Sequence, residues 1–318
     1  MTNEKEFSLV ALEDEYVVSS HGLSRHRPGL HPTEASVVSI IDGRELIVGQ
    51  CMRSSWYRSM EKKKTNPASP GLMQKANLGK WDENGLIERW KEMGIWIGNS
   101  IKFYQKNYYL SGEMDAIIRE PETGRKIGYE VKTFYGYYAN KVITGAKESK
   151  KMKTPMVPGV PKDNQFLQSI VYAWEYRDQL DEYRMYYMER GDGHRVEFRI
   201  GFDELPSGEH QVWWQQVPGK YWNGFAPEKV LQPYNIEGIY ARYDQLLAKL
   251  KAKEMPPREF STKWDAEKVE WMWEHGLVGK TKYNAWKKKP ETNPIGDWNC
   301  DYCSYRSLCD LDASENSD

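Results

Sequence analysis

The four cysteines constrain this chain more than any other feature of its sequence. Three of them lie within ten residues near the C-terminus, in the pattern Cys300-x2-Cys303-x5-Cys309, and the fourth, Cys51, lies far upstream. Four cysteines in 318 residues are too few for a disulfide scaffold, whereas soft thiolates in this arrangement suit a metal centre. A fold that uses all of them in one centre has to bring Cys51 next to the C-terminal three.

Composition excludes several classes of protein. With 45 Lys and Arg against 46 Asp and Glu, the net charge is −1, so any contact with nucleic acid must come from a local basic patch. The 13 Trp, 21 Tyr and 8 Phe are enough to build a core, which argues against disorder of the whole chain. No apolar run approaches the roughly 18 residues of a membrane span, and the first residues are not typical of a signal peptide. We therefore expect a cytoplasmic protein.

Sequence patterns predict a mixed α/β architecture. Apolar residues on both sides of Asp42-Gly43 predict a hairpin over 37–48, although a helix there stays open. Helical spacing covers 72–93, about 15 residues from Asn164, and 236–253. Short strand patterns cover 108–112, 114–118, 126–132, 183–188 and 196–202, with turn residues between them.

These patterns divide the chain into five expected segments. They are a flexible N-terminal arm at 1–35, a first-cysteine segment at 36–71, an α/β core at 72–205 with a basic insertion at 134–162, a C-terminal region with three cysteines at 206–309, and a disordered acidic tail at 310–318.

The residues with the clearest chemistry lie on two neighbouring strands of the core. Glu130 and Lys132 are two apart in a predicted strand and therefore project to the same side. Such a pair alone is most often an ordinary ion pair. Asp115, however, lies on the preceding strand across a tight turn, so its carboxylate can converge with that of Glu130. Two carboxylates could bind Mg²⁺ or Mn²⁺, and Lys132 could stabilise charge on a phosphodiester that a metal-bound water attacks.

This set of residues resembles the PD-(D/E)xK nuclease superfamily, in which an Asp on one strand and a Glu-x-Lys on the next surround the scissile phosphate. Gln168 and Tyr172, which share a helix face, are similar to the Q-x3-Y motif of the RecB-like branch. The segment from Gly79 to Glu83 resembles the helix that carries an additional metal ligand in that branch. We align Glu83 with a position that is usually His, and Asp82 stays open as the alternative. The resemblance implies a restriction-endonuclease-like sheet flanked by helices.

The cysteines extend the resemblance to an iron–sulfur subset of this branch, which includes CRISPR-adaptation exonucleases. Cys51-Met-Arg53-x2-Trp56-Tyr57 resembles the first-cysteine segment of that subset, with Met52 in place of the usual Pro. The resemblance implies a structural [4Fe–4S] cluster that is bound by Cys51, Cys300, Cys303 and Cys309, in a helical cap formed by both chain ends. Ligand softness alone leaves zinc with four thiolates as the alternative.

Two basic segments are candidates for DNA contact. One is the Lys-rich stretch at 141–153, and the other is 280–289, where lysines alternate with Tyr283 and Trp286. Lysines could neutralise phosphates and the rings could stack on unpaired bases, but a solvated charged face explains either segment as well.

Two other enzyme classes are not supported. The segment at 276–281 lacks the first glycine of a phosphate-binding loop, because Glu274 stands at that position. The six histidines show no spacing typical of a zinc hydrolase.

We therefore expect a Mg²⁺- or Mn²⁺-dependent deoxyribonuclease in a bacterial cytoplasm or a phage-infected cell. Its expected mode is exonucleolytic, on single-stranded or unwound DNA. Two alternatives stay open. One is a catalytically silent DNA-binding or assembly protein, and the other is a nuclease subunit that is active only within a larger recombination, CRISPR or phage complex.

Overall fold

The chain forms two compact units. The computed structural model describes residues 9–22, 29–136, 143, 145–146, 157–191, 193–218 and 228–315. The first unit, here called the sheet unit, comprises Met1–Gly49 and Ala68–Asp244; the second, here called the cysteine unit, comprises Gln50–Pro67 and Gln245–Asp318.

A seven-stranded mixed sheet forms the centre of the sheet unit. Its strand order is β11-β10-β9-β8-β5-β4-β3, and every neighbouring pair is antiparallel except β5 and β8. The strands are β3 (Trp96–Gln105), β4 (Leu110–Arg119), β5 (Lys126–Phe134), β8 (Glu182–Glu189), β9 (Arg195–Glu204), β10 (His210–Gln216) and β11 (Val230–Asn235). The parallel pair requires a long connection, and this connection contains the helix α5 (Asp163–Glu175).

Two small antiparallel sheets lie outside this large sheet. They are β1 (Ser36–Ile41) with β2 (Arg44–Gly49), and β6 (Gly145–Ala146) with β7 (Val157–Pro158). The first is the predicted hairpin. Its turn residues Asp42 and Gly43 both have positive φ, 47° and 77°, as two-residue hairpin turns require.

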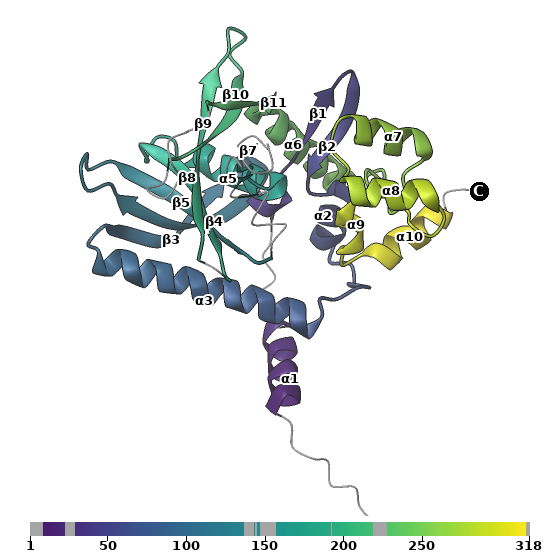
Figure 1. Ribbon diagram of the computed structural model, residues 1–318, viewed down its shortest axis with the longest axis horizontal. Helices are drawn as coiled ribbons and strands as arrows, with labels where there is room; N and C mark the ends of the chain where they lie inside the picture. Colours follow the sequence, from purple (N-terminus) through teal and green to yellow (C-terminus); the bar gives the residue numbers. More distant parts are fainter. Residues whose placement is uncertain are drawn as a thin grey trace, which may run out of the picture. The chain divides into compact units, whose positions relative to one another are not determined.

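Helices cover both faces of the large sheet. Those of the sheet unit are α1 (Leu9–Gly22), η1 (Pro32–Glu34), α3 (Pro70–Glu92), η2 (Lys106–Tyr108), α5 (Asp163–Glu175) and the first part of α6 (Ile236–Ala252). The helix α3 lies along β3 and β5, and α5 lies against β8 and β9 (Figure 1). Ser69 caps α3 by accepting a hydrogen bond from Leu72 N, and Pro70 follows at the first helical position.

Alternate residues of β5 point to different helices. Tyr129 and Val131 pack with Leu86 and Trp90 of α3 in one buried cluster, whereas Glu130 accepts a hydrogen bond from α5. This is the alternation of a strand that is covered on both faces, and it places Glu130 on the α5 side of the sheet.

In the cysteine unit, all the regular secondary structure of the described residues is helical. Its helices are α2 (Met52–Ser59), α7 (Ala266–Glu274), α8 (Lys280–Lys288), α9 (Trp298–Asp301) and α10 (Arg306–Glu315), together with the end of α6. A core of six residues, Trp264, Val269, Val278, Tyr283, Trp286 and Ile295, lies between α7 and α8 and their flanking segments. Thr65 N and Asn66 N both donate to Ser304 O at 2.9 Å, which joins the two chain segments of the unit.

The expected fold class is confirmed at the level of a mixed α/β protein with a large mixed sheet flanked by helices. None of the described helices has the length and apolar character needed to cross a membrane. Most of the basic insertion, including Lys141, Lys147, Lys150, Lys151 and Lys153, lies outside the described residues.

The two terminal segments differ from expectation. The expected arm at 1–35 contains α1 and η1, and α1 lies beside α3 with Val17 buried. The expected tail continues as helix to Glu315, because the Asp312 carboxylate accepts a hydrogen bond from the buried Tyr57 hydroxyl. In the C-terminal segment this tertiary contact overrides a polar local composition, whereas α1 has an apolar sequence around Val17.

The compact units also divide the chain at different residues from the expected segments. The hairpin at 36–49 lies in the sheet unit and not with Cys51, and residues 206–244 also belong to the sheet unit. The reason is strand pairing, because β10 and β11 extend the large sheet beyond β9.

Candidate active site

Strand pairing brings Asp115 and Glu130 together. Ala116 of β4 is the partner of Tyr129 in β5, and both of these side chains belong to the buried cluster on the α3 face. Their neighbours Asp115 and Glu130 therefore point to the opposite face. Val131 N donates to Asp115 Oδ2 at 2.7 Å, which fixes this carboxylate against β5.

Glu130 is the most buried acidic residue of this group, with 1% of its surface exposed. Its Oε1 atom accepts hydrogen bonds from Lys132 Nζ and from Gln168 Nε2, the latter at 2.7 Å. Its Oε2 atom is buried and accepts no hydrogen bond from the described residues. A buried carboxylate oxygen without a partner is costly, so this atom is the position where a cation would be most favourable.

Electrostatics at the site follow from burial and from the two carboxylates. Burial raises the pKa of Asp115 well above its ordinary value, and the neighbouring Glu130 charge raises it further. Burial also raises the pKa of Glu130, although Lys132 opposes this shift. Burial alone would lower the pKa of Lys132, but the Glu130 and Asp115 carboxylates raise it, so Lys132 stays protonated. A divalent cation would relieve the repulsion between the two acids.

The structure separates the roles of Asp82 and Glu83 on α3. The charge of Glu83 raises the pKa values of both Asp115 and Glu130, and its side chain, 14% exposed, forms an ion pair with Lys80 at 2.5 Å. Asp82 Oδ2 instead pairs with Arg190 Nε at 2.9 Å. Glu83 is therefore the acid of this pair that acts on the β4–β5 carboxylates.

The two predicted α5 residues occupy different positions around the site. Gln168 contacts Glu130 directly, as described above. The Tyr172 ring, 4% exposed, packs edge-on against Phe103 at 5.8 Å, and its hydroxyl accepts a hydrogen bond from Glu113 N at 3.3 Å. Burial raises the pKa of Tyr172, so the hydroxyl stays protonated. Tyr172 thus anchors α5 to β4, whereas Gln168 orients the Glu130 carboxylate.

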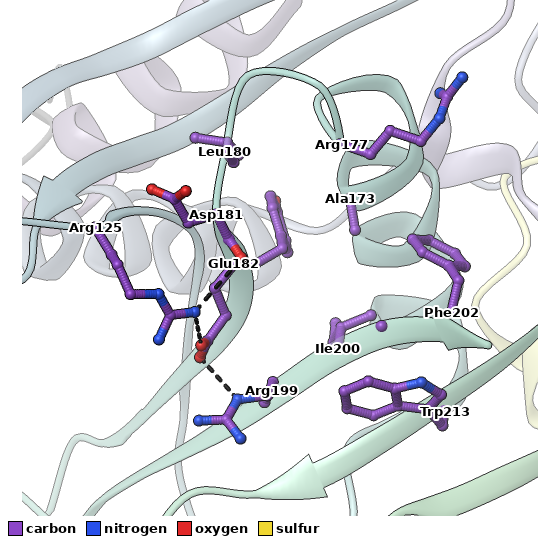
Figure 2. Close-up of a pocket in the computed structure, with 12 residues that line it drawn as sticks. Arg125, Ala173, Arg177, Leu180, Asp181, Glu182, Arg199, Ile200, Phe202 and Trp213 are labelled. Atoms are coloured by element: carbon purple, nitrogen blue, oxygen red, sulfur yellow. Dashed lines mark hydrogen bonds and ion pairs between the residues drawn. The ribbon is translucent and has the colours of Figure 1, made fainter. Parts of the chain in front are cut away.

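A separate pocket of about 430 Å³ lies in another part of the sheet unit (Figure 2). Arg125 and Arg199 hold the Glu182 carboxylate there at 2.6 and 2.9 Å, opposite an apolar wall that includes Ile200, Phe202 and Trp213. None of the site residues predicted from sequence lines this pocket. Its buried carboxylate is neutralised by arginines and so lacks the free oxygen that distinguishes Glu130.

The four predicted cysteine ligands all lie in the cysteine unit, and none forms a disulfide. Burial raises the pKa of Cys51 to about 12, and the Cys303 charge adds to this shift. Burial likewise raises the pKa of Cys300 to about 11, with contributions from Cys303 and Cys309. The charge of Cys303 thus acts on both Cys51 and Cys300, and the charge of Cys309 acts on Cys300. Arg53 Nη1 is 3.6 Å from Cys309 Sγ and places a cation beside them.

Among the described residues, no three His, Cys, Asp or Glu side chains form a ready-made metal-binding group. Magnesium typically uses one or two carboxylates and completes its shell with water and substrate oxygens. The free Oε2 of Glu130 and the adjacent Asp115 fit that requirement. Soft thiolates suit iron or zinc, so the residues at the cysteine site fit either metal.

For the segment 280–289, the prediction that its aromatic rings could stack on unpaired bases was wrong. Tyr283 and Trp286 are only 6% and 9% exposed and belong to the core of the cysteine unit, so they are not available for base stacking. The lysines of this segment, Lys280, Lys282, Lys287, Lys288 and Lys289, are exposed.

One residue of the site region was missed in the sequence. Arg190 joins α3 to β5 through Asp82 and Thr133. It directly precedes a predicted turn, and no motif marks it.

Comparisons of the chain with models of protein families, with curated proteins and with solved structures find no significant match. The functional assignment therefore depends on the geometry of the site.

Proposed function

We propose that this protein is a Mg²⁺- or Mn²⁺-dependent deoxyribonuclease of the PD-(D/E)xK type, with a restriction-endonuclease-like sheet. The observation that carries the proposal is the buried, unpartnered Oε2 of Glu130, which lies beside Asp115 and Lys132 on paired strands. In a purely structural Glu-x-Lys pair such an oxygen would be unfavourable, because most buried polar atoms have a hydrogen-bond partner.

Each residue of the site has a role in this proposal. Glu130 and Asp115 hold the metal, and Glu83 supplements them from α3. When bound, Mg²⁺ or Mn²⁺ supplies a charge that polarises the phosphodiester and acidifies a water molecule. Lys132, which stays protonated between the two acids, stabilises negative charge on the attacked phosphate. Gln168 keeps the Glu130 carboxylate in its orientation through the hydrogen bond to Oε1, and Tyr172 holds α5 in place.

DNA is the proposed substrate and partner, with single strands or free ends preferred. The exposed lysines of α8 provide a local cationic surface in a chain whose net charge is −1. Such a surface binds phosphates without sequence preference, which suits an exonuclease.

The cysteine unit is proposed to hold a [4Fe–4S] cluster through Cys51, Cys300, Cys303 and Cys309. The four cysteines lie in one unit, and Arg53 lies beside Cys309. This arrangement supports a shared metal centre, because the arginine would stabilise the negative charge of thiolate ligands. A site of four thiolates also suits zinc, and iron and sulfide analysis of protein purified without oxygen separates the two.

Cleavage of end-labelled DNA tests the proposed activity. Protein purified without oxygen is incubated with single-stranded or duplex DNA in Mg²⁺, Mn²⁺ or EDTA. We expect Glu130→Gln to reduce cleavage by at least about 100-fold, because it removes a metal-binding charge. Glu88→Gln on the exposed face of α3, where the side chain is 67% exposed, is the matched control and should cleave like wild type.

The pattern of products and of binding distinguishes the alternatives. Stepwise loss from a labelled end indicates an exonuclease, and internal fragments indicate an endonuclease. A wild-type protein that binds DNA but cleaves none of it with either metal would overturn the free-standing nuclease and favour a binding or assembly role. Activity that appears only after addition of a co-purifying partner would favour a subunit of a larger complex.

A further inference from the structure

Arg190 connects three elements of the sheet unit. It follows β8 directly, and its backbone N donates to Phe134 O at 2.9 Å. Its guanidinium lies 2.9 Å from Asp82 Oδ2 and 3.0 Å from Thr133 Oγ1 through Nε, and both terminal nitrogens donate to Lys75 O at 3.3 Å. One planar cation thus binds α3 at two points about two turns apart and β5 at a third.

The first half of α3 has little apolar attachment to the sheet. The buried residues of this helix are Leu86, Ile87 and Trp90, all in its second half. Leu72, Leu78 and Trp81 in the first half are 47%, 44% and 67% exposed. The polar contacts of Arg190 with Lys75 and Asp82 therefore hold a part of the helix that hydrophobic packing does not fix to the sheet.

The close approach of α3 to Arg190 depends on a glycine. A Cβ atom at Gly79 would lie 2.9 Å from Arg190 Nη2 and 3.5 Å from Thr133 Oγ1. A side chain there would push the flexible guanidinium away. Gly85, in the same helix, has no atom within 4 Å of the corresponding position, so the two glycines form a matched pair.

Glu83 lies between these two attachments. The Arg190 contacts end at Asp82, and the apolar contacts begin at Leu86. Thr133, in turn, directly follows Lys132 in β5, so Arg190 couples the strand of the site to the helix that supplies Glu83. We propose that Arg190 is a positioning residue that holds the first half of α3, and with it Glu83, in register with Asp115 and Glu130. The metal-binding part of this inference rests on the proposed nuclease function.

Hydrogen exchange of the purified full-length chain tests the positioning without any metal. Arg190→Ala should speed amide exchange in residues 72–82 by about tenfold or more, because it removes several charge-assisted hydrogen bonds, while residues 86–90 stay protected. Gly79→Ala should have the same local effect and Gly85→Ala should not. Arg190→Lys should fall between wild type and alanine, because an ammonium cannot reproduce the planar fork. Unchanged exchange, or an equal increase along the whole helix, would overturn the positioning role.

Mn²⁺ titration by calorimetry tests the coupling to Glu83. We expect Arg190→Ala to weaken Mn²⁺ binding by 10- to 100-fold, as for other residues that orient ligands, and the double variant with Glu83→Gln to bind no more weakly than the weaker single variant. Arg177→Ala, at an arginine on the C-terminal side of α5, should bind like wild type. Additive losses would mean that Arg190 does not act through Glu83. Absence of Mn²⁺ binding by wild type would overturn the nuclease proposal and the metal-binding part of this inference, whereas the exchange result decides the positioning separately.

Discussion

At the scale of single residues, two partly buried carboxylates of the sheet unit have opposite electrostatic surroundings. Asp115 lies next to Glu130, and its pKa is raised by burial and by that negative charge. Glu182 lies among arginines, and its pKa is lowered by hydrogen bonds from Arg184, Arg199 and Arg125, although burial opposes this shift. The surroundings of Asp115 disfavour its ionised form, as expected of a carboxylate that binds a cation. The surroundings of Glu182 stabilise its ionised form, as expected of an acid in a structural ion pair.

Asp115→Asn should stabilise the metal-free protein at pH 7. The raised pKa of Asp115 in the folded state means that ionisation costs stability above its unfolded value near 3.8, and an asparagine oxygen can still accept the Val131 N–H. Melting temperatures measured from pH 7 downward should show a gain of a few degrees that disappears below pH 4. Saturating Mn²⁺ should reverse the order, because only wild type gains from tight binding. If Asp115→Asn is less stable than wild type at pH 7 without metal, the ionised Asp115 does not destabilise the folded protein, which would contradict the raised pKa.

Glu182→Gln should have the opposite sign. The lowered pKa of Glu182 contributes stability above its unfolded value of 4.5, and this contribution is lost as the pH falls through the folded pKa. With its side chain 5% exposed and shared among arginines, the loss at pH 7 should be about 3 kcal/mol. Denaturant unfolding at pH 7 and in strong acid checks this: the difference should be large at pH 7 and small in acid. If the variant and wild type differ equally in unfolding free energy at pH 7 and in strong acid, the ionised Glu182 is not the source of the stability.

At the scale of elements, close contact between β4 and α5 shapes the site. Gly112 lies where a Cβ atom would be 2.6 Å from ring atoms of both Phe103 and Tyr172. Tyr172 is one helical turn from Gln168, so the distance between strand and helix also sets the distance from Gln168 to Glu130.

Gly112→Ala should therefore destabilise the protein by about 1–3 kcal/mol, the usual cost of overpacking, and should lower the proposed nuclease activity by displacing α5. Gly85→Ala, in open space on α3, should instead add up to about 1 kcal/mol through helix propensity. Urea unfolding of the two variants gives the comparison. A neutral Gly112→Ala would show that the contact is looser than described.

Most of these elements can be predicted from the sequence. The hairpin at Asp42-Gly43, the helices α3, α5 and α6, and the strands β4, β5, β8 and β9 all follow from periodicity and turn residues, which act locally. Two other features were missed in the sequence, and both make tertiary contacts. The helix α1 is stabilised where Val17 is buried, and Arg190 acquires its role only when β8 lies beside β5.

For the candidate site as well, the sequence predicts what depends on local spacing and does not predict what depends on tertiary contacts. The neighbouring strands place Asp115, Glu130 and Lys132 together, as their spacing indicated, and an i, i+4 pair places Gln168 near them. Spacing could not separate Glu83 from Asp82. Adjacent residues of a helix point in different directions, and only the packing of the helix on the sheet shows which of the two faces the site. Nor could it show that Tyr283 and Trp286 are buried, since lysines and rings also alternate in a helix with one apolar face.

At the scale of the whole molecule, two segments that are far apart in the sequence form one compact unit, whereas the N-terminal residues Met1–Gly49 belong to the sheet unit. Residues 50–67 and 245–318 form the cysteine unit, and the four cysteines come from both segments. The contacts of Thr65 and Asn66 with Ser304 join them. A shared metal centre would stabilise this unit further, because metal binding adds to folding free energy.

Cys51→Ser should remove bound iron and sulfide and lower the melting temperature of the cysteine unit. Ser307→Ala, at an exposed position of α10, is the control and should keep both. Iron and sulfide analysis combined with calorimetry of anaerobic protein gives the result. Full iron content in Cys51→Ser would exclude Cys51 as a ligand, and zinc without iron in wild type would replace the cluster by a tetrahedral zinc site.

The free Oε2 of Glu130 is the centre of this account, and anomalous diffraction from crystals grown with Mn²⁺ tests it most directly. We predict a manganese peak within coordination distance of Glu130 Oε2 and an Asp115 oxygen, with loss of the peak in Glu130→Gln. A protein that binds no manganese at these carboxylates, or binds it only elsewhere in the sheet unit, would contradict the proposed metal site and the nuclease mechanism built on it.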